Sequence, residues 1–155
     1  MIIKINKIIC LALFSSSLLL VNGCAPRGET QNLSDILTQA RDRFRLAEQG
    51  AASFSAKGQV TMVVDKLAAI EKVQDPAILK PATQELSVLL AALMPRAGYT
   101  VRPSFAEIVG QYRALGNGSA VTTDSSKPGA PEIRLLLVRT YSLLASELET
   151  GKFAF

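Results

Sequence analysis

The sequence of 155 residues lacks histidine and tryptophan and contains only two cysteines. Without histidine, the Ser-His-Asp and Cys-His arrangements of nucleophilic catalysis are excluded, and so are imidazole metal ligands. The carboxylates are scattered, and Glu147 and Glu149 do not share a helix face, so we expect no metal site. No Ser-x-x-Lys motif occurs, and no glycine-rich phosphate loop follows a strand. We therefore expect a protein without enzymatic activity, metal or diffusible cofactor.

Proline and glycine are also few, with 7 and 10 residues, which excludes a fibrous or low-complexity chain. Hydrophobic residues make up 48% of the sequence and charged residues 19%, which is enough apolar material to fold. The formal net charge is +4, but Lys4 and Lys7 lie among the first 23 positions, where no acidic residue occurs. The remaining chain is therefore close to neutral, and we expect no nucleic-acid partner.

The first 23 residues combine a positive start with an apolar run. Lys4 and Lys7 precede the apolar stretch 8–21, which is interrupted only by three serines. This stretch of about 14 residues is shorter than the roughly 20 residues that span a bilayer as a helix. The pattern is typical of an export signal, so residues 1–23 are predicted to be a signal peptide.

The apolar run ends in Val21-Asn22-Gly23-Cys24. An aliphatic residue three positions before a cysteine, and a small residue one position before it, resemble the lipobox of bacterial lipoproteins. Asn22 departs from the small residue usual at its position, and the resemblance covers residues 1–24 only. It implies that the Cys24 thiol is linked to a diacylglycerol, that the signal peptide is removed before Cys24, and that the new N-terminus is acylated. Cys10 leaves with the signal peptide, so no disulfide is expected.

The residues after Cys24 indicate the membrane to which the protein is sorted. Ala25, rather than Asp, follows the cysteine, and by resemblance to Gram-negative lipoproteins this implies sorting to the outer membrane. The expected location is the inner leaflet of the outer membrane, with the folded domain facing the periplasm. Residues 24–32 are predicted to be the lipidated cysteine and a polar tether. The eight residues after Cys24 reach at most about 27 Å at ~3.4 Å each.

Five segments of the remaining chain carry apolar residues at helical spacing. The second contains many β-branched residues, so a strand over 59–64 is an alternative, although the spacing of its charges favours a helix. Pro81 is placed near the start of the third helix, with Ala77–Lys80 as a preceding turn. The Asp75-Pro76 pair either ends the second segment or caps the next element. The predicted segments are 33–49, 60–70, 79–93, 104–115 and 131–150.

Two connections between these segments are predicted to be irregular. Residues 95–103 form a loop with a brief extended stretch at 99–102, after which Ser104 and Glu107 match a capping box that begins a helix. Residues 116–131 are rich in Gly, Ser, Thr and Pro and form a long exposed loop. The predicted fold of residues 33–155 is therefore all-α, a small bundle of four to five helices after an N-terminal signal peptide and short tether.

Aromatic residues provide the candidate binding surfaces. Tyr99, Phe105 and Tyr112 either line a groove beside the 95–103 loop or belong to the core. Phe153 and Phe155 lie near the carboxyl end, where they either fold back on the core or dock a partner. Tyr99, Phe153 and Phe155 are the candidates retained for a binding surface.

The predicted anchor and helical domain favour a non-catalytic adaptor, a pilotin-like assembly factor or an accessory subunit of an envelope complex. The expected partners are membrane lipid, through Cys24, and another envelope protein. Pilotins include small helical lipoproteins, but this analogy concerns format alone. The sequence does not distinguish this hypothesis from a lipoprotein that acts in conjugation or phage exclusion. The alternative is a carrier that binds a lipid or peptide in an apolar groove lined by Leu86, Leu90, Ile108, Tyr112 and Tyr141.

Overall fold

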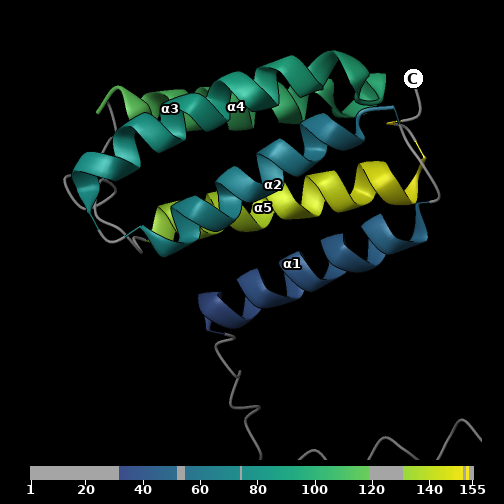
Figure 1. The fold of residues 1–155 in the computed structure, drawn as a ribbon, viewed down its shortest axis with the longest axis horizontal. Helices are drawn as coiled ribbons and strands as arrows, with labels where there is room; N and C mark the ends of the chain where they lie inside the picture. The colour runs from purple at the N-terminus through teal and green to yellow at the C-terminus, as the bar shows by residue number, and fades with distance from the viewer. Residues whose placement is uncertain (1–31, 52–54, 74, 119–130, 152, 154–155) are drawn as a thin grey trace, which may run out of the picture. The chain divides into compact units, whose positions relative to one another are not determined.

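The computed structural model describes residues 32–51, 55–73, 75–118, 131–151 and 153 (Figure 1). All of these belong to one compact unit, Gln31–Phe155. Several predicted features lie outside the described residues: the signal peptide, the lipobox residues Val21, Asn22 and Gly23, the lipidation site Cys24, and Phe155.

The described residues form five α-helices and two short 3-10 turns, and no strand occurs among them. The predicted all-α bundle is confirmed, and the ambiguous segment at 59–64 is helical rather than extended. The helices are α1 (Leu33–Gly50), α2 (Lys57–Lys72), α3 (Pro76–Leu93), α4 (Arg102–Gly116) and α5 (Pro131–Glu149), and the turns are η1 (Met94–Arg96) and η2 (Tyr99–Val101).

Consecutive helices run in alternating directions, so α1, α3 and α5 end on the same side of the bundle (Figure 1). α1 packs on α5, α3 packs on α4, and α2 packs on α3. The connection between α3 and α4 therefore lies at the end of the bundle where α1 and α5 finish. The chain enters the bundle at the opposite end, through Asn32 at the start of α1 (Figure 1).

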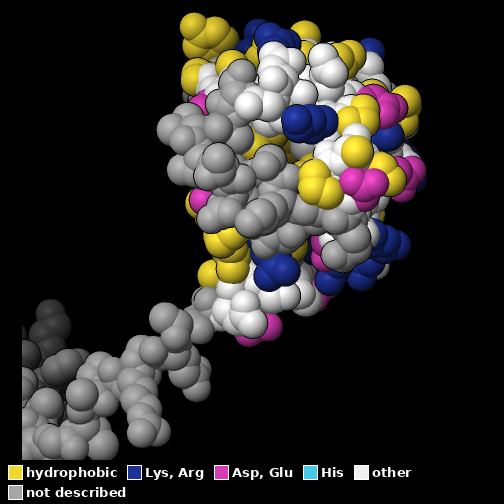
Figure 2. Space-filling model, turned by 90° about the vertical axis from the view of Figure 1, so that its left-hand side faces the viewer, with side chains coloured by type: hydrophobic (Ala, Val, Ile, Leu, Met, Phe, Trp, Pro, Cys, Tyr) yellow, Lys and Arg dark blue, Asp and Glu magenta, His cyan; other side chains and the backbone are white. Residues whose placement is uncertain are grey.

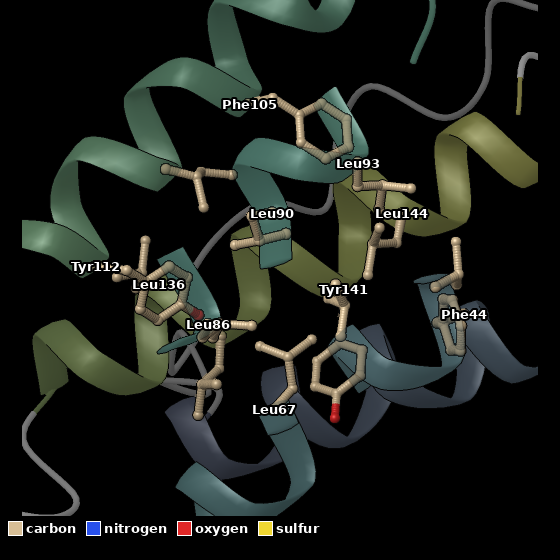
Figure 3. Packing of buried hydrophobic residues seen from close by; sticks show 14 of the residues in the cluster. Phe44, Leu67, Leu86, Leu90, Leu93, Phe105, Tyr112, Leu136, Tyr141 and Leu144 are labelled. Carbon is tan, nitrogen blue, oxygen red and sulfur yellow. The ribbon is translucent and has the colours of Figure 1, made fainter. Parts of the chain in front are cut away.

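Each helix contributes an apolar stripe to one shared core (Figure 3). Full burial of a large apolar side chain stabilises a fold by about 1.5–3 kcal/mol, so this core dominates the stability of the bundle. Among the core residues are Phe44, Leu67, Leu86, Leu90, Leu93, Phe105, Tyr112, Leu136, Tyr141 and Leu144.

One buried hydroxyl pair joins α4 to α5 inside this core. The Thr140 hydroxyl donates to the carbonyl oxygen of Leu136 at 2.7 Å, so its proton is used there. The Tyr112 hydroxyl, 3.1 Å from Thr140 Oγ1, is therefore the donor in the second bond. Burial raises the pKa of Tyr112 well above its ordinary value. The pair satisfies both polar groups, which is why they are tolerated in an apolar core.

The start of α3 differs from the prediction. The helix begins at Pro76, with the Asp75 carboxylate accepting from the Ala77 amide at 2.8 Å. This cap provides the partner that a helix start needs, and proline is favoured directly after it because its missing N–H is not required there. The predicted turn Ala77–Lys80 is therefore wrong, since these residues are helical. Pro81 lies within the helix, one turn later than predicted.

The start of α4 also differs. The helix begins at Arg102, with Val101 as its N-cap, and no side chain caps it. The predicted capping box is therefore wrong, as is the extended stretch at 99–102, which is the 3-10 turn η2. The Glu107 carboxylate accepts from Arg139 of α5 at 2.8 Å rather than from the backbone near Ser104. The Glu107 carboxylate, which the local pattern assigned to the cap, therefore binds a distant arginine instead.

One stretch of the described chain, Pro76–Arg96, is long and apolar enough to cross a membrane by length and composition, with a mean hydropathy of 1.3. The core helix of a soluble domain passes the same criterion. Here Leu86, Leu90 and Leu93 are buried against the other helices. Packing within the bundle accounts for the apolar character of this face of α3.

Candidate interaction site

The α3–α4 connection and the end of α5 form a surface hollow of ≈ 490 Å³. We call this region the Tyr99 hollow. Ligand pockets in proteins commonly measure about 300–1,000 Å³, so the hollow has room for several side chains rather than a single ion. It is lined by Pro95, Arg96, Ala97, Gly98, Tyr99, Arg102, Thr150 and Gly151.

Tyr99 is the most exposed large apolar side chain among the described residues, with 84% of its surface open to solvent. The residues before it explain this position. Ala97 is buried, and its amide donates to the Met94 carbonyl at 3.1 Å. The Gly98 carbonyl in turn accepts from the Val101 amide at 3.0 Å. These contacts fix the backbone on both sides of Tyr99, so the ring projects outward from a held loop.

A buried carboxylate on α5 also fixes the loop that carries Tyr99. Glu147 of α5 is 1% exposed, and its Oε2 accepts from the Gly98 amide at 2.6 Å. This bond joins the end of α5 to the α3–α4 connection, which is 49 residues away in the sequence. Gly151, with φ of 66°, then turns the chain where α5 ends. Glycine adopts this left-handed conformation without the steric penalty that other residues incur.

Sequence reasoning missed Glu147, which it considered only as a metal ligand. A signal was present, because Glu147 falls on the apolar stripe of its helix, one turn after Leu144 and beside Leu148. A carboxylate on an apolar stripe requires a partner when buried. The partner itself is a backbone amide from a distant segment, which periodicity does not identify.

Two arginines stand at the hollow without a carboxylate partner. Arg102 donates through Nε to the Ala97 carbonyl at 3.2 Å and through Nη2 to the Pro95 carbonyl at 2.9 Å. Arg96 is exposed, and its Nη1 lies 3.4 Å from the Ser55 hydroxyl. Among the described residues, neither guanidinium forms an ion pair. Within the part of the chain that the structure describes, both charges are therefore left for a bound group.

The structure separates the three aromatic residues of the predicted groove. Phe105 and Tyr112 are buried in the core, which is the second of the two predicted alternatives, and Tyr99 alone is exposed. Phe153 is 1% exposed, and its ring meets that of Phe105 edge-on with centroids 6.3 Å apart. Phe153 therefore folds back on the core and presents no surface to a partner.

The five residues expected to line a carrier groove lie in the core of the bundle, and Figure 3 labels all of them except Ile108. All five are almost fully buried, and Tyr112 and Tyr141 extend from α4 and α5 into the packing. Burial raises the pKa of Tyr141 to about 12, and the nearby Glu71 carboxylate adds to this shift. Within the described part of the chain, no three Cys, Asp or Glu side chains come together as a metal site would require.

The chain matches no protein-family model, and neither the curated proteins nor the solved structures contain a significant match.

Proposed function

We propose that this chain is a lipid-anchored protein of the bacterial cell envelope and that its helical bundle is a non-catalytic adaptor. In this proposal Cys24 is lipidated and holds the protein at the inner leaflet of the outer membrane. The bundle faces the periplasm and binds another envelope protein through the Tyr99 hollow. A pilotin-like assembly factor and an accessory subunit of an envelope complex are both forms of this function.

The observation that carries the proposal is the exposure of Tyr99 on a held loop. An aromatic side chain with few rotatable bonds offers a large contact area at a small entropic cost. Aromatic and arginine residues are also the types that most often dominate binding energy at protein interfaces. Here Tyr99 lines the hollow together with Arg96 and Arg102, on a loop whose Gly98 amide is bound by Glu147. A preformed loop of this kind needs little reorganisation to bind.

The position of the hollow supports a partner away from the membrane. The chain enters the bundle at Asn32, and the hollow lies at the opposite end (Figure 1). α1 has 18 residues, which corresponds to a helix of about 27 Å at 1.5 Å per residue. The hollow is therefore about one helix length from the point where an anchored chain would enter the bundle.

The lipid anchor is tested by Cys24→Ser, with Cys10→Ser as the matched control. Cys24→Ser is expected to abolish metabolic labelling with a lipid precursor and to leave unprocessed chain. Cys10→Ser changes the other cysteine and is expected to leave labelling and processing intact. A Cys24→Ser protein that still matures to the wild-type mass would disprove the anchor.

The adaptor function is tested by photocrosslinking in cells at native expression level. A benzoylphenylalanine placed at position 99 is expected to capture one envelope protein in stoichiometric amount after detergent extraction. The control position is Leu46 of α1, which is 69% exposed and lies outside the hollow. Equal capture at both positions would contradict a specific interface. Retention of a lipid or small molecule in place of a protein would favour the alternative, a carrier.

A further inference from the structure

We infer that the Tyr99 hollow recognises an acidic, extended segment of the partner protein, whose carboxylate groups bind Arg96 and Arg102 while an apolar neighbour packs on Tyr99. This inference rests on the adaptor function proposed above and specifies the chemistry of the partner.

The charge of the hollow is the first argument. Two of its eight lining residues are arginines and none is acidic. The Glu147 carboxylate, which contacts the loop, is buried and accepts from the Gly98 amide. Even when Glu147 is counted as negative, the two arginines leave an excess of positive charge. An anionic segment is therefore the complementary ligand.

The arrangement of Arg102 is the second argument. Two of its three nitrogens are bound to the carbonyls of Pro95 and Ala97, which fixes the plane of the guanidinium. Its third nitrogen, Nη1, forms no hydrogen bond with another described residue. A guanidinium fixed in this way loses little freedom when a carboxylate binds. Arg96 is exposed beside it and supplies a second donor group.

Size and position favour a protein segment over a lipid surface. A hollow of ≈ 490 Å³ is too large for one carboxylate and suits several consecutive side chains. It also lies at the end of the bundle opposite Asn32 (Figure 1). Figure 2 views the bundle from the Asn32 end, where the described basic and acidic side chains are interspersed.

The test uses the full chain, ¹⁵N-labelled and purified in detergent, and a pair of synthetic peptides. One is an acetylated, amidated nonapeptide of Glu, Leu and Gly, and the other has Gln in place of each Glu. The Glu peptide is expected to shift the amide signals of Gly98 and Tyr99 and to bind about tenfold more tightly than the Gln peptide, as charge-assisted hydrogen bonds predict. Its affinity is expected to fall as salt is added.

Variants then locate the interaction. Arg96→Gln is expected to weaken Glu-peptide binding about fivefold to tenfold, the effect of losing one charge-assisted contact. The matched control is Arg113→Gln on α4, because Arg113 is exposed and forms no ion pair with a described residue. It is expected to bind the peptide as the wild type does. Tyr99→Ala is expected to weaken the binding of both peptides. Arg102→Lys retains the positive charge but loses the fixed geometry of the guanidinium.

Several results would overturn the inference. One is equal affinity for the Glu and Gln peptides. Another is the absence of any shift in the amide signals of Gly98 and Tyr99 up to millimolar peptide. A third is an equal loss of peptide affinity in Arg96→Gln and Arg113→Gln. Binding of phosphatidylglycerol vesicles that depends on Arg96 would replace the peptide with a lipid surface. Tighter binding after deletion of residues 154–155 would identify the chain's own tail as the occupant. If photocrosslinking at position 99 captures a protein while the peptides fail, the adaptor stands and only the acidic preference is lost.

Discussion

Basic side chains on the flanks of the bundle and at the Tyr99 hollow have different partners. On the flanks, four of them meet carboxylates of neighbouring helices at 2.6 to 3.0 Å. At the hollow, the described partners of Arg96 and Arg102 are neutral oxygens. The flank pairs are Arg41–Glu71, Arg43–Glu149, Lys66–Glu85 and Arg139–Glu107.

The difference separates two uses of charge in one small domain. Exposed ion pairs contribute only about 0–1 kcal/mol each, so the flank pairs select which helix faces meet rather than supply the stability. The arginines at the hollow do not join two helix faces in this way. Arg102 orders the loop that carries Tyr99, and the net charge of both remains directed outward. The four flank pairs are therefore satisfied within the bundle, whereas, within the described part of the chain, Arg96 and Arg102 are left open to a partner.

The largest effect is expected from a comparison of two aromatic residues, Phe105 in the core and Tyr99 at the hollow. Phe105→Ala removes a fully buried ring that packs on Phe153, and we expect a loss of about 3–5 kcal/mol in the free energy of unfolding. Tyr99→Ala removes an exposed ring, and we expect a change within about 0.5 kcal/mol. Chemical denaturation followed by circular dichroism measures both. A Tyr99→Ala loss comparable to that of Phe105→Ala would mean that Tyr99 packs on the bundle and that the hollow is not open.

The next effect compares two glutamates separated by one residue on α5. Glu147→Ala leaves the Gly98 amide without its acceptor, and we expect a loss of about 1–3 kcal/mol in the free energy of unfolding. We also expect amide exchange at Gly98 to become faster, because the loop is no longer joined to α5. Glu149→Ala breaks only an exposed pair with Arg43, so its effect on stability is expected to be much smaller. Equal effects would contradict the distinction between a held loop and a flank pair.

The sequence predicted the helices well because their stabilising pattern is local. Apolar spacing identified all five segments, and the start of α1 agrees with the structure beside its Asn32 cap. The start of α3 was predicted three residues too late although its Asp75 cap is local. Other errors arose where a distant residue decides the outcome. Glu107 accepts from Arg139, 32 residues away, rather than completing a local cap. Arg102 bonds to carbonyls before its own helix and so belongs to a structured turn that no hydrophobic pattern marks.

The candidate site was predictable only in part for the same reason. Tyr99 was recognised as a candidate because it is an aromatic residue in the 95–103 loop. The loop that carries it is held by Glu147, which accepts from the Gly98 amide from another helix. This is a long-range contact that single-sequence patterns do not contain. The hollow itself is made by two segments about 50 residues apart, so its existence follows from the fold alone.

A smaller effect concerns the flank beside Arg41 and Glu71. Burial raises the pKa of Tyr141 to about 12, whereas an unfolded tyrosine ionises near pH 10. Between these values the unfolded state binds fewer protons than the folded state, so stability is expected to fall as pH rises from 10 to 12. Tyr141→Phe removes this contribution and is expected to make the fall shallower. Denaturation at a series of alkaline pH values measures it, and an unchanged slope would contradict the raised pKa.

The smallest effect measures a flank pair directly. Arg43 donates through Nε and Nη2 to the two carboxylate oxygens of Glu149 at 2.9 and 2.6 Å, and this hydrogen bonding lowers the pKa of Glu149. The associated stability is present above the ordinary glutamate pKa and is lost as pH falls through the lowered value. Arg43→Gln is expected to return the Glu149 pKa toward its ordinary value in a ¹³C carboxyl NMR titration. Arg45→Gln, which alters an arginine paired with Asp42 at 3.9 Å, is expected to leave it unchanged. If both variants shift Glu149 equally, the flank acts as a diffuse field of charge, and the contrast with the two arginines at the hollow loses its basis.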